Sequence, residues 1–478
     1  MLLPQIVPDG TLNAMLTPTV RLGVTGLARA GKTVFITALV RNLMAGGRLP
    51  FFVPAAEGRL ASAHLEPQPN DAIPRFDYEA HLEKLCRTPP EWPDSTRQIS
   101  QLRLVLTYQT RSRLKRVAGR SAVNVDIIDY PGEWLLDLAL LDESYTQWSA
   151  RALAAVRSRS STPASKAYLE FLAGIGATSA DGEQTAIAGA DLFKQHLLAA
   201  RAGGSGVATL GPGRFLLPGD LAGSPLLTFF PLDVGSERDK RTSLRAMMER
   251  RYESYRTHVV RPFFRNHFSR LDRQIVLVDV LSALNSGAAA VHDLEDALFL
   301  SLKAFRPGSQ TWLAQLFRPR IDKVLFAATK ADHLHHTSHD RLEAILRLLT
   351  ERAAARITGA GADIGVLALA SLRATREAEA RDGDEKLPCI AGVPLPGEEI
   401  GGTVFDGIRE AVVFPGDLPQ DASAALERAG TTHAASTAAF VKFRPPLLQR
   451  KKSGSEVAPM PHIRLDRALE FRIGDWLT

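Results

Sequence analysis

The sequence predicts an α/β fold in which helices flank a doubly wound sheet. Three observations predict this fold. Short apolar runs typical of buried strands alternate with helix-like segments along the chain, which is the pattern of repeated strand–helix units. A glycine-rich loop joins the first of these strands to the first helix. Polar motifs follow several of the strands directly, at the strand ends where open α/β sheets bind ligands.

The composition is that of a globular protein with room for two or three domains. The chain has 478 residues, of which 45% are hydrophobic and 23% charged, as in soluble proteins. Its two cysteines, Cys86 and Cys389, are too few for a disulfide framework and indicate a reducing compartment. We find no apolar run of transmembrane length and no signal-peptide pattern at the start, so we expect a cytoplasmic protein.

The first strand-like run, residues 20–25, leads into Gly-Leu-Ala-Arg-Ala-Gly-Lys-Thr at 26–33, and helix-like residues 34–40 follow. This is the phosphate-binding pattern G-x-x-x-x-G-K-[ST] in its strand–loop–helix context. Backbone N–H groups of such a loop surround nucleotide phosphates, while Lys32 reaches the β- and γ-oxygens and the Thr33 hydroxyl holds Mg²⁺. The expected phosphate-site residues are Gly26, Ala28, Arg29, Ala30, Gly31, Lys32, Thr33 and Val34.

A second motif, Asp-x-x-Gly, ends the strand-like run 123–129. Asp129 is expected to contact Mg²⁺ through water, and the Gly132 N–H to bond the γ-phosphate. Residues 99–108 form an alternating strand before it, and the loop preceding that strand carries a Mg²⁺-binding Thr in GTPases. Thr96 is our first candidate for this Mg²⁺ ligand, and Ser95 is the second. The alternative is that Thr96 is an ordinary loop residue without a role in metal binding.

The nucleotide base is expected to contact Thr329-Lys330-Ala331-Asp332, which follows the buried-type strand 323–328. This matches [NT]-K-x-D, in which the carboxylate of Asp332 accepts hydrogen bonds from guanine N1–H and N2–H₂ and the Lys330 stem packs on the base. Adenine offers no such donor pair, so guanine is favoured. After the strand 365–369, Ala-Ser-Leu at 370–372 resembles the Ser-Ala-x loop behind the guanine ring in altered order. Ser371 and Leu372 are the residues expected there.

The motifs leave a long interval before the next core strand at residues 274–280. No simple connection needs that length, so we predict an inserted, mainly helical domain at 136–270. The core then comprises 18–135 and 271–376, and a C-terminal extension with short strands and a terminal helix spans 377–478. Because the insertion leaves directly from the γ-phosphate motif, it is placed to move on hydrolysis. The extension shows no visible chemistry.

Segments 26–35, 129–137 and 328–333 together resemble the YcjX-like family, formerly a domain of unknown function, over residues 21–476. The resemblance implies a bacterial cytoplasmic P-loop NTPase with a helical insertion, a link to stress and a small membrane-protein partner. We therefore expect a Ras-like GTPase fold that binds GTP or GDP with Mg²⁺, and a location in the cytoplasm or at the inner membrane. The family label has often been ATPase, whereas 329–332 favours GTP.

The catalytic candidates are Lys32, Arg29, Thr96 and Glu133. Glu133 stands where Ras-like proteins have a water-orienting Gln, but its charge is repelled by the γ-phosphate, and a salt-bridging or helix N-terminal role is the alternative. Arg29 stands where guanylate-binding and atlastin-type GTPases place an internal arginine finger. It could act in cis after homodimer or partner contact; an exposed arginine is the alternative.

Two further patterns remain open. Arginines concentrate at 111–120 and 238–273, and such a face could bind anionic lipid, nucleic acid or an acidic partner. Glu249 and Glu253 offer local ion pairs to the second group, so we expect a solvated face there and no specific nucleic-acid binding. The second pattern consists of four histidines, for which we favour a solvated loop over a metal site because Asp340 alone could complete the ligand set. The four are His333, His335, His336 and His339.

Three functional classes therefore fit the sequence. The first is a GTPase switch, the second an ATPase of the same fold, and the third a nucleotide-dependent binding module with negligible turnover. The preference for GTP or ATP distinguishes the GTPase from the ATPase, and the rate of nucleotide hydrolysis distinguishes both of them from the binding module.

Overall fold

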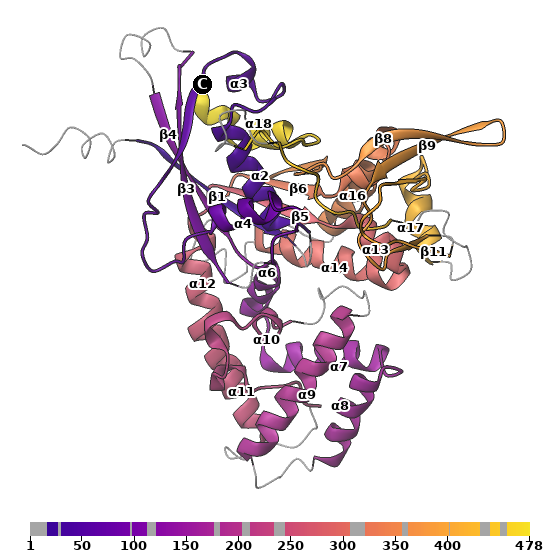
Figure 1. Ribbon diagram of the computed structural model, residues 1–478. Helices are drawn as coiled ribbons and strands as arrows, with labels where there is room; N and C mark the ends of the chain where they lie inside the picture. The colour runs from indigo at the N-terminus through magenta and orange to yellow at the C-terminus, as the bar shows by residue number, and fades with distance from the viewer. Residues whose placement is uncertain are drawn as a thin grey trace, which may run out of the picture.

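A seven-stranded sheet forms the centre of the computed structural model (Figure 1). The structure describes residues 17–26, 30–95, 98–111, 121–175, 182–202, 211–233, 244–305, 321–355, 362–400, 402–430, 440–449 and 457–478. The strand order is β2-β3-β4-β1-β5-β6-β7. The strands are β1 Thr19–Gly26, β2 Leu60–Glu66, β3 Ser100–Tyr108, β4 Ser121–Asp129, β5 Arg273–Val278, β6 Lys323–Ala328 and β7 Asp363–Ala368.

The sheet is mainly parallel. Strands β4, β1, β5, β6 and β7 pair in parallel, whereas β2 and β3 are antiparallel additions at one edge. The parallel register places Asp129 beside Val24 and aligns the ends of β5, β6 and β7. The carboxyl ends of the parallel strands therefore meet at one edge, which is where ligands bind in such sheets.

Helices cover both faces of the sheet, as the sequence predicted. Ile275 and Leu277 of β5 lie in one apolar core, and the intervening Val276 and the following Val278 lie in another. Because neighbouring side chains of a strand point to opposite faces, the two cores lie on opposite sides. Helices α2 Lys32–Met44 and α18 Leu465–Ile473 contribute to the first core. Helices α14 Ala288–Phe305 and α16 His339–Ala355 contribute to the second.

Between β4 and β5 the described residues form helices and loops without a strand. The α-helices are α6 Glu133–Leu138, α7 Tyr145–Ser158, α8 Pro163–Gly174, α9 Gly182–Ala202, α10 Gly213–Leu216, α11 Leu244–Tyr255 and α12 Arg261–Asn266. The shorter turns are η1 Ala139–Asp142, η3 Gly219–Leu221, η4 Pro225–Leu227, the π-helix η5 Arg256–Val260 and η6 Phe268–Arg270. Figure 1 shows α7 to α11 grouped below the sheet. The described residues of this segment are thus mainly helical, and the inserted domain with its boundaries stays a prediction.

Aromatic side chains fill the interior of this helical part. Trp148 is fully buried, stacks on Tyr252 at 5.2 Å and meets Phe193 and Phe229 edge-on at 6.0 and 5.4 Å. Such pairs add about 0.5–1.5 kcal/mol each beyond their buried area. The same apolar core continues to Val276 under the sheet, so the interior of the helical part is continuous with the core on one face of the sheet.

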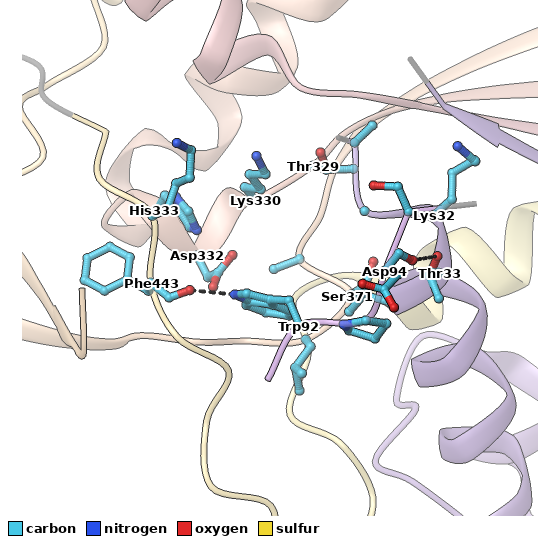
Figure 2. Close-up of a pocket in the computed structure, with 18 of the residues that line it drawn as sticks. Lys32, Thr33, Trp92, Asp94, Thr329, Lys330, Asp332, His333, Ser371 and Phe443 are labelled. Atoms are coloured by element: carbon cyan, nitrogen blue, oxygen red, sulfur yellow. Dashed lines mark hydrogen bonds between the residues drawn. The ribbon is translucent and has the colours of Figure 1, made fainter. Parts of the chain in front are cut away.

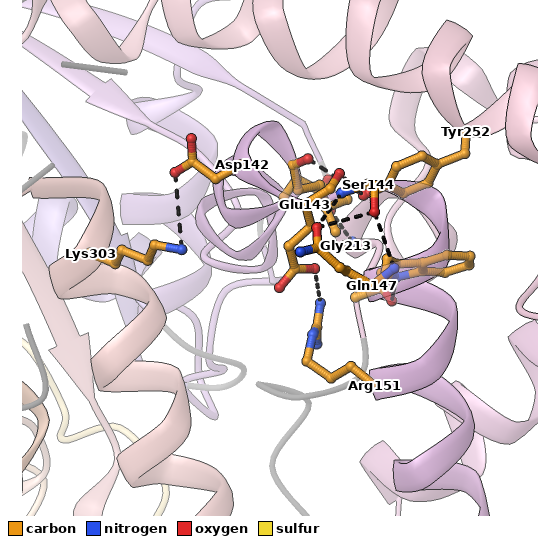
Figure 3. Close-up of polar contacts among 12 residues, drawn as sticks. Asp142, Glu143, Ser144, Gln147, Arg151, Gly213, Tyr252 and Lys303 are labelled. Atoms are coloured by element: carbon orange, nitrogen blue, oxygen red, sulfur yellow. Dashed lines mark hydrogen bonds and ion pairs between the residues drawn. The ribbon is translucent and has the colours of Figure 1, made fainter. Parts of the chain in front are cut away.

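Polar contacts fix the start of α7 (Figure 3). Ser144 and Gln147 form a reciprocal capping box, which satisfies two of the free N–H groups at the helix start. The Glu143 carboxylate accepts a charge-assisted hydrogen bond from Arg151 at 2.8 Å. The Glu143 carbonyl oxygen accepts a hydrogen bond from the Tyr252 hydroxyl at 3.1 Å. Lys303 of α14 lies 4.0 Å from Asp142. These contacts connect η1, α7, α11 and α14 at the junction below the sheet.

The second basic segment is partly paired. Arg256 forms an ion pair with Glu253, and Arg251 pairs with Glu183 of α9. The side chains of Arg251 and Arg256 are only 12% and 13% exposed, so these two arginines are packed against their neighbours, and the solvated face expected for the whole segment stays a prediction. Most of the first basic segment, residues 112–120, lies outside the described residues.

The C-terminal part contains two small sheets and returns to the main one. Its elements are β8 Arg376–Asp382, β9 Glu385–Gly392, β10 Glu399–Ile400, β11 Thr403–Val404, β12 Ala411–Val413, α17 Ala422–Gly430, α18 and η9 Gly474–Leu477. Elsewhere lie α3 Val53–Ala56, α4 Tyr78–Leu85, α13 Val280–Ser286, η7 Ala331–His333 and η8 His336–Ser338. Leu465, Leu469 and Ile473 of α18 pack in the same core as Val24. The terminal helix is thus an integral part of the central fold.

Candidate functional site

A cavity of about 400 Å³ opens at the carboxyl edge of the sheet (Figure 2). It brings together most of the sequence-predicted residues, although they are scattered over the chain. The predicted residues that line it are Ala30, Gly31, Lys32, Thr33, Val34, Ser95, Glu133, Thr329, Lys330, Asp332, Ser371 and Leu372. A volume of this size is typical of small-molecule sites.

The phosphate motif occupies one end of the cavity. Gly31 has φ 83° directly before α2, a left-handed conformation that suits glycine and lets the chain turn into the helix. Lys32 follows, with its Nζ 3.5 Å from the Gly26 carbonyl oxygen. The Thr33 hydroxyl donates to the carbonyl oxygen of Asp94 at 3.2 Å, which ties the helix start to the loop before β3. Ala28 and Arg29 lie outside the described residues.

The Asp-x-x-Gly motif lies beside this loop. Asp129 ends β4, opposite Val24, and is 1% exposed. The Tyr130 N–H donates to the Val24 carbonyl at 3.3 Å, and the Thr25 hydroxyl donates to the Tyr130 carbonyl at 3.1 Å. These bonds hold the chain after Asp129 against β1. Gly132 is buried there.

Glu133 is the first residue of α6 and lines the cavity while being only 3% exposed. Glu133 therefore lines the same cavity as Lys32. Thr33 and Asp129 supply hydroxyl and carboxylate oxygens, the hard donors that Mg²⁺ prefers. Thr96, the third candidate for that ion, lies outside the described residues.

The Thr-Lys-x-Asp motif occupies the other end of the cavity. Thr329 N–H donates to Val278 O at 2.9 Å, and Ala331 N–H donates to Leu369 O at 3.1 Å, so the loop is fixed to two neighbouring strands. Lys330 adopts φ 62°, which is uncommon for a residue with a side chain, and it forms an ion pair with Asp279. The backbone of the motif is thus held firmly in an unusual conformation.

Asp332 is buried at this end of the cavity. It is 4% exposed, and its carboxylate accepts a bond from the Ala374 N–H at 2.8 Å, while its carbonyl accepts one from the Thr375 hydroxyl. Burial raises the pKa of Asp332 to about 6. The carboxyl group is therefore mostly ionised at pH 7 yet depends on hydrogen-bond donors, because its surroundings solvate the charge poorly.

His333 departs from the solvated loop expected for the histidines. It is 8% exposed, and its ring meets Phe443 edge-on at 5.4 Å. Burial lowers the pKa of His333 to about 3, so it is a neutral wall of the cavity. His339 is also buried. The expectation was wrong for these two residues: His333 packs against Phe443, far away in the sequence, and His339 contacts the nearby Leu334 carbonyl through Nε2 at 3.3 Å.

The remaining walls were not foreseen from the sequence. Trp92 lines the cavity, and its indole Nε1–H donates to the Phe443 carbonyl at 2.7 Å; Figure 2 shows this bond. Leu217 comes from the helical part, and Leu395, Lys442 and Phe443 come from the C-terminal part. The interpretation that the extension carries no chemistry is therefore corrected: it forms a wall of the cavity. No local pattern signals such contacts.

The cavity also connects to the helical part through α6. A Cβ added to Gly213 would lie 2.1 Å from the Glu133 carbonyl oxygen, so the two backbones touch. Asp137 accepts bonds from the Gly213 N–H and the Tyr255 hydroxyl, each at 2.6 Å. The Arg214 guanidinium lies 3.3 Å from the centre of the Trp134 ring. Residues 213, 214 and 255 of the helical part thus contact and hold the segment that starts at Glu133.

The fold and the cavity define a mixed α/β protein with a ligand-sized site at the carboxyl edge of a mainly parallel sheet. The chain belongs to the YcjX-like family (DUF463), whose model matches residues 20–477. It is 37% identical over 471 residues to the Ras-like GTPase YcjX of Escherichia coli K12, covering 96% of each chain. It is 33% identical over 486 residues to the Ras-like GTPase YcjX of Shewanella oneidensis, covering 96% of this chain and 94% of that protein.

These matches confirm the family resemblance drawn from the motifs. Within the described ranges, none of the helices has both the length and the apolar character needed to cross a bilayer.

Proposed function

We propose that this protein binds GTP in the cavity and hydrolyses it to GDP and inorganic phosphate, with Mg²⁺, as a P-loop switch of the Ras-like type. The observation that carries the proposal is the convergence of Lys32 and Thr33 with Lys330 and Asp332 on one cavity. Two relatives that match this chain along its length are named Ras-like GTPases, which supports the same conclusion.

The preference for guanine rests on Asp332. Its carboxylate already accepts one backbone bond, from Ala374, but an ionised carboxylate has about four acceptor sites and can take two more donors. Guanine supplies N1–H and N2–H₂ together. Adenine would leave the buried charge poorly satisfied, which costs about 1–3 kcal/mol or more.

The phosphates would lie at the opposite end, against the backbone of Gly31 and the Lys32 ammonium. Thr33 and Asp129 would hold Mg²⁺, which when bound neutralises charge on the β- and γ-phosphates. The donor set fits this ion by type: Thr33 offers a hydroxyl oxygen and Asp129 a carboxylate, the hard oxygen donors that Mg²⁺ prefers, and Asp129 ends the strand beside β1.

In the hydrolytic step, water attacks the γ-phosphorus while the bond to the β–γ bridging oxygen breaks. Glu133 lines the same cavity as Lys32 and is proposed to orient the water, and Lys32 is proposed to stabilise charge on the phosphates. Roles for Arg29 and Thr96 stay predictions. So do the link to stress, the membrane-protein partner and the homodimer.

The helical part is the proposed output of the switch. Glu133 directly follows Gly132, the proposed γ-phosphate contact, and Gly213 and Asp137 hold the helix that begins there. A shift of Gly132 after phosphate release would therefore reach the helical part through packed atoms.

Replacing the base-reading carboxylate tests the proposal. We expect Asp332→Asn to weaken GTP about 100-fold, because two charge-assisted bonds of about 1.5 kcal/mol each are lost, and to improve xanthosine triphosphate, whose base presents a carbonyl in place of the amino group. Asp340→Asn is the matched control, since Asp340 is exposed and pairs with Arg464. Unchanged GTP affinity in Asp332→Asn would contradict the assignment.

A further inference from the structure

Three side chains with metal-binding atoms meet beside the Asp332 loop, outside the cavity. His335 and His336 come from the loop after Asp332, and Glu377 lies near the start of β8. One ligand atom from each lies within 4.8 Å of the other two, and no other such group occurs in the part of the chain that the structure describes. His336 Nδ1 is 3.0 Å from Glu377 Oε2, and the two imidazole centres are 4.2 Å apart.

We propose that His335, His336 and Glu377 bind a divalent transition-metal ion of the Zn²⁺ type. Two imidazoles and one carboxylate form a set that binds Zn²⁺ tetrahedrally, with water in the fourth position. Softer thiolates are absent from the group, and hard cations such as Mg²⁺ prefer oxygen ligands alone. The ligand type therefore selects an imidazole-binding metal.

The surroundings suit such an ion. The side chains of His336 and Glu377 are 59% and 40% exposed, so an ion can enter and the ligands can adjust by small rotations. His335 Nδ1 contacts the Thr337 hydroxyl at 3.0 Å, which leaves Nε2 for the metal and fixes the ring, as neighbouring groups do for metal-binding histidines. Arg373 lies 3.4 Å from Glu377 and competes for it, so we expect moderate affinity.

The position of the site gives the ion a regulatory consequence. Ala374 and Thr375 bond to Asp332, and Glu377 follows Thr375 by two residues, while the histidines follow Asp332 on the other segment. An ion shared between the two segments would fasten them and keep Asp332 in place. Resting on the proposed function, this predicts that Zn²⁺ slows the release of guanine nucleotide.

The test is a calorimetric titration of the tag-free, full-length protein with ZnCl₂. We expect one site in the wild type and at least about tenfold weaker binding in His335→Asn, His336→Asn and Glu377→Gln. The matched control is His64→Asn, because His64 lies 3.6 Å from Glu66 in a histidine–glutamate pair that lacks a second imidazole. Circular dichroism checks that each variant is folded. Zn²⁺ affinity that is unaffected by all three substitutions would overturn the proposal.

A second measurement separates this proposal from the proposed function. Release of a fluorescent GDP analogue is followed with Zn²⁺ and with a Zn²⁺-selective chelator, in the wild type and in Glu377→Gln. Slower release with Zn²⁺ in the wild type alone supports the regulatory role, and equal release refutes that role. Failure to bind any guanine nucleotide would refute the proposed function, while the Zn²⁺ titration would still decide the metal site.

Discussion

Replacing Gly213 by alanine tests whether the helical part supports the segment that begins at Glu133, the residue proposed to orient the attacking water. The added Cβ would lie 2.1 Å from the Glu133 carbonyl oxygen and 2.5 Å from its carbonyl carbon. The closest comfortable carbon–oxygen contact is about 3.3 Å, so the overlap is about 1.2 Å and falls on the Glu133 backbone, while the added Cβ is itself fixed to the Gly213 backbone. Neither partner can rotate away, so one of the two segments must move.

Overpacking of this kind costs about 1–3 kcal/mol. We expect Gly213→Ala to lower the free energy of unfolding by that amount in urea denaturation. Because the displaced atom belongs to Glu133, we also expect kcat for GTP hydrolysis to fall at least about tenfold, while GTP affinity changes less than about threefold because Asp332 and Lys32 are untouched.

Gly174→Ala is the matched control. Gly174 ends α8, and a Cβ there meets no atom within 4 Å, so alanine should be neutral or stabilising by about 0.5–1 kcal/mol. Equal stability and turnover of Gly213→Ala and the wild type would refute the close contact between the helical part and Glu133.

Two further predictions concern the walls of the cavity. GTP affinity should fall as the pH drops through about 6, because burial raises the pKa of Asp332 to about 6 and the protonated carboxyl group accepts fewer hydrogen bonds from guanine. Titrations with GTP between pH 5 and 8 measure this change. A pH profile identical to that of Asp332→Asn would contradict the prediction. Trp92→Phe should lower the free energy of unfolding by about 1 kcal/mol, because the hydrogen bond to Phe443 is lost, and it should remove the change in tryptophan fluorescence on nucleotide binding. The control is Tyr108→Phe, which loses a 3.1 Å hydrogen bond to the Trp476 carbonyl away from the cavity and should keep that fluorescence change.

The central sheet could be predicted where each strand is a contiguous apolar run. Strands β1, β4, β5 and β6 have mainly apolar runs, because they lie inside the sheet and are largely buried. Strand β3 is signalled by its alternating pattern, and the edge strand β7 by the short apolar run before residues 370–372. Strand β2, Leu60–Glu66, lies at an edge and is half exposed along its length, and β8, Arg376–Asp382, is largely charged. Both lack the apolar signal and were missed.

In the candidate site, too, residues with a local sequence signal could be predicted and residues brought in by long-range contacts could not. Residues such as Lys32 and Asp332 stand in short motifs whose spacing is set by local backbone chemistry, so the sequence locates them. Phe443 and Trp92 are 351 positions apart and become neighbours only after the C-terminal part folds back. Burial of His333 depends on the same contact, so no local pattern could have predicted it.

The most direct test of the central claim is an equilibrium titration of the wild type with GTP and ATP in the presence of Mg²⁺. Lys32→Ala serves as the binding-deficient variant. The arrangement of Asp332 predicts GTP binding at least about 100-fold tighter than ATP binding, with both lost in Lys32→Ala. Equal or tighter binding of ATP would contradict the assignment of the cavity to guanine nucleotides.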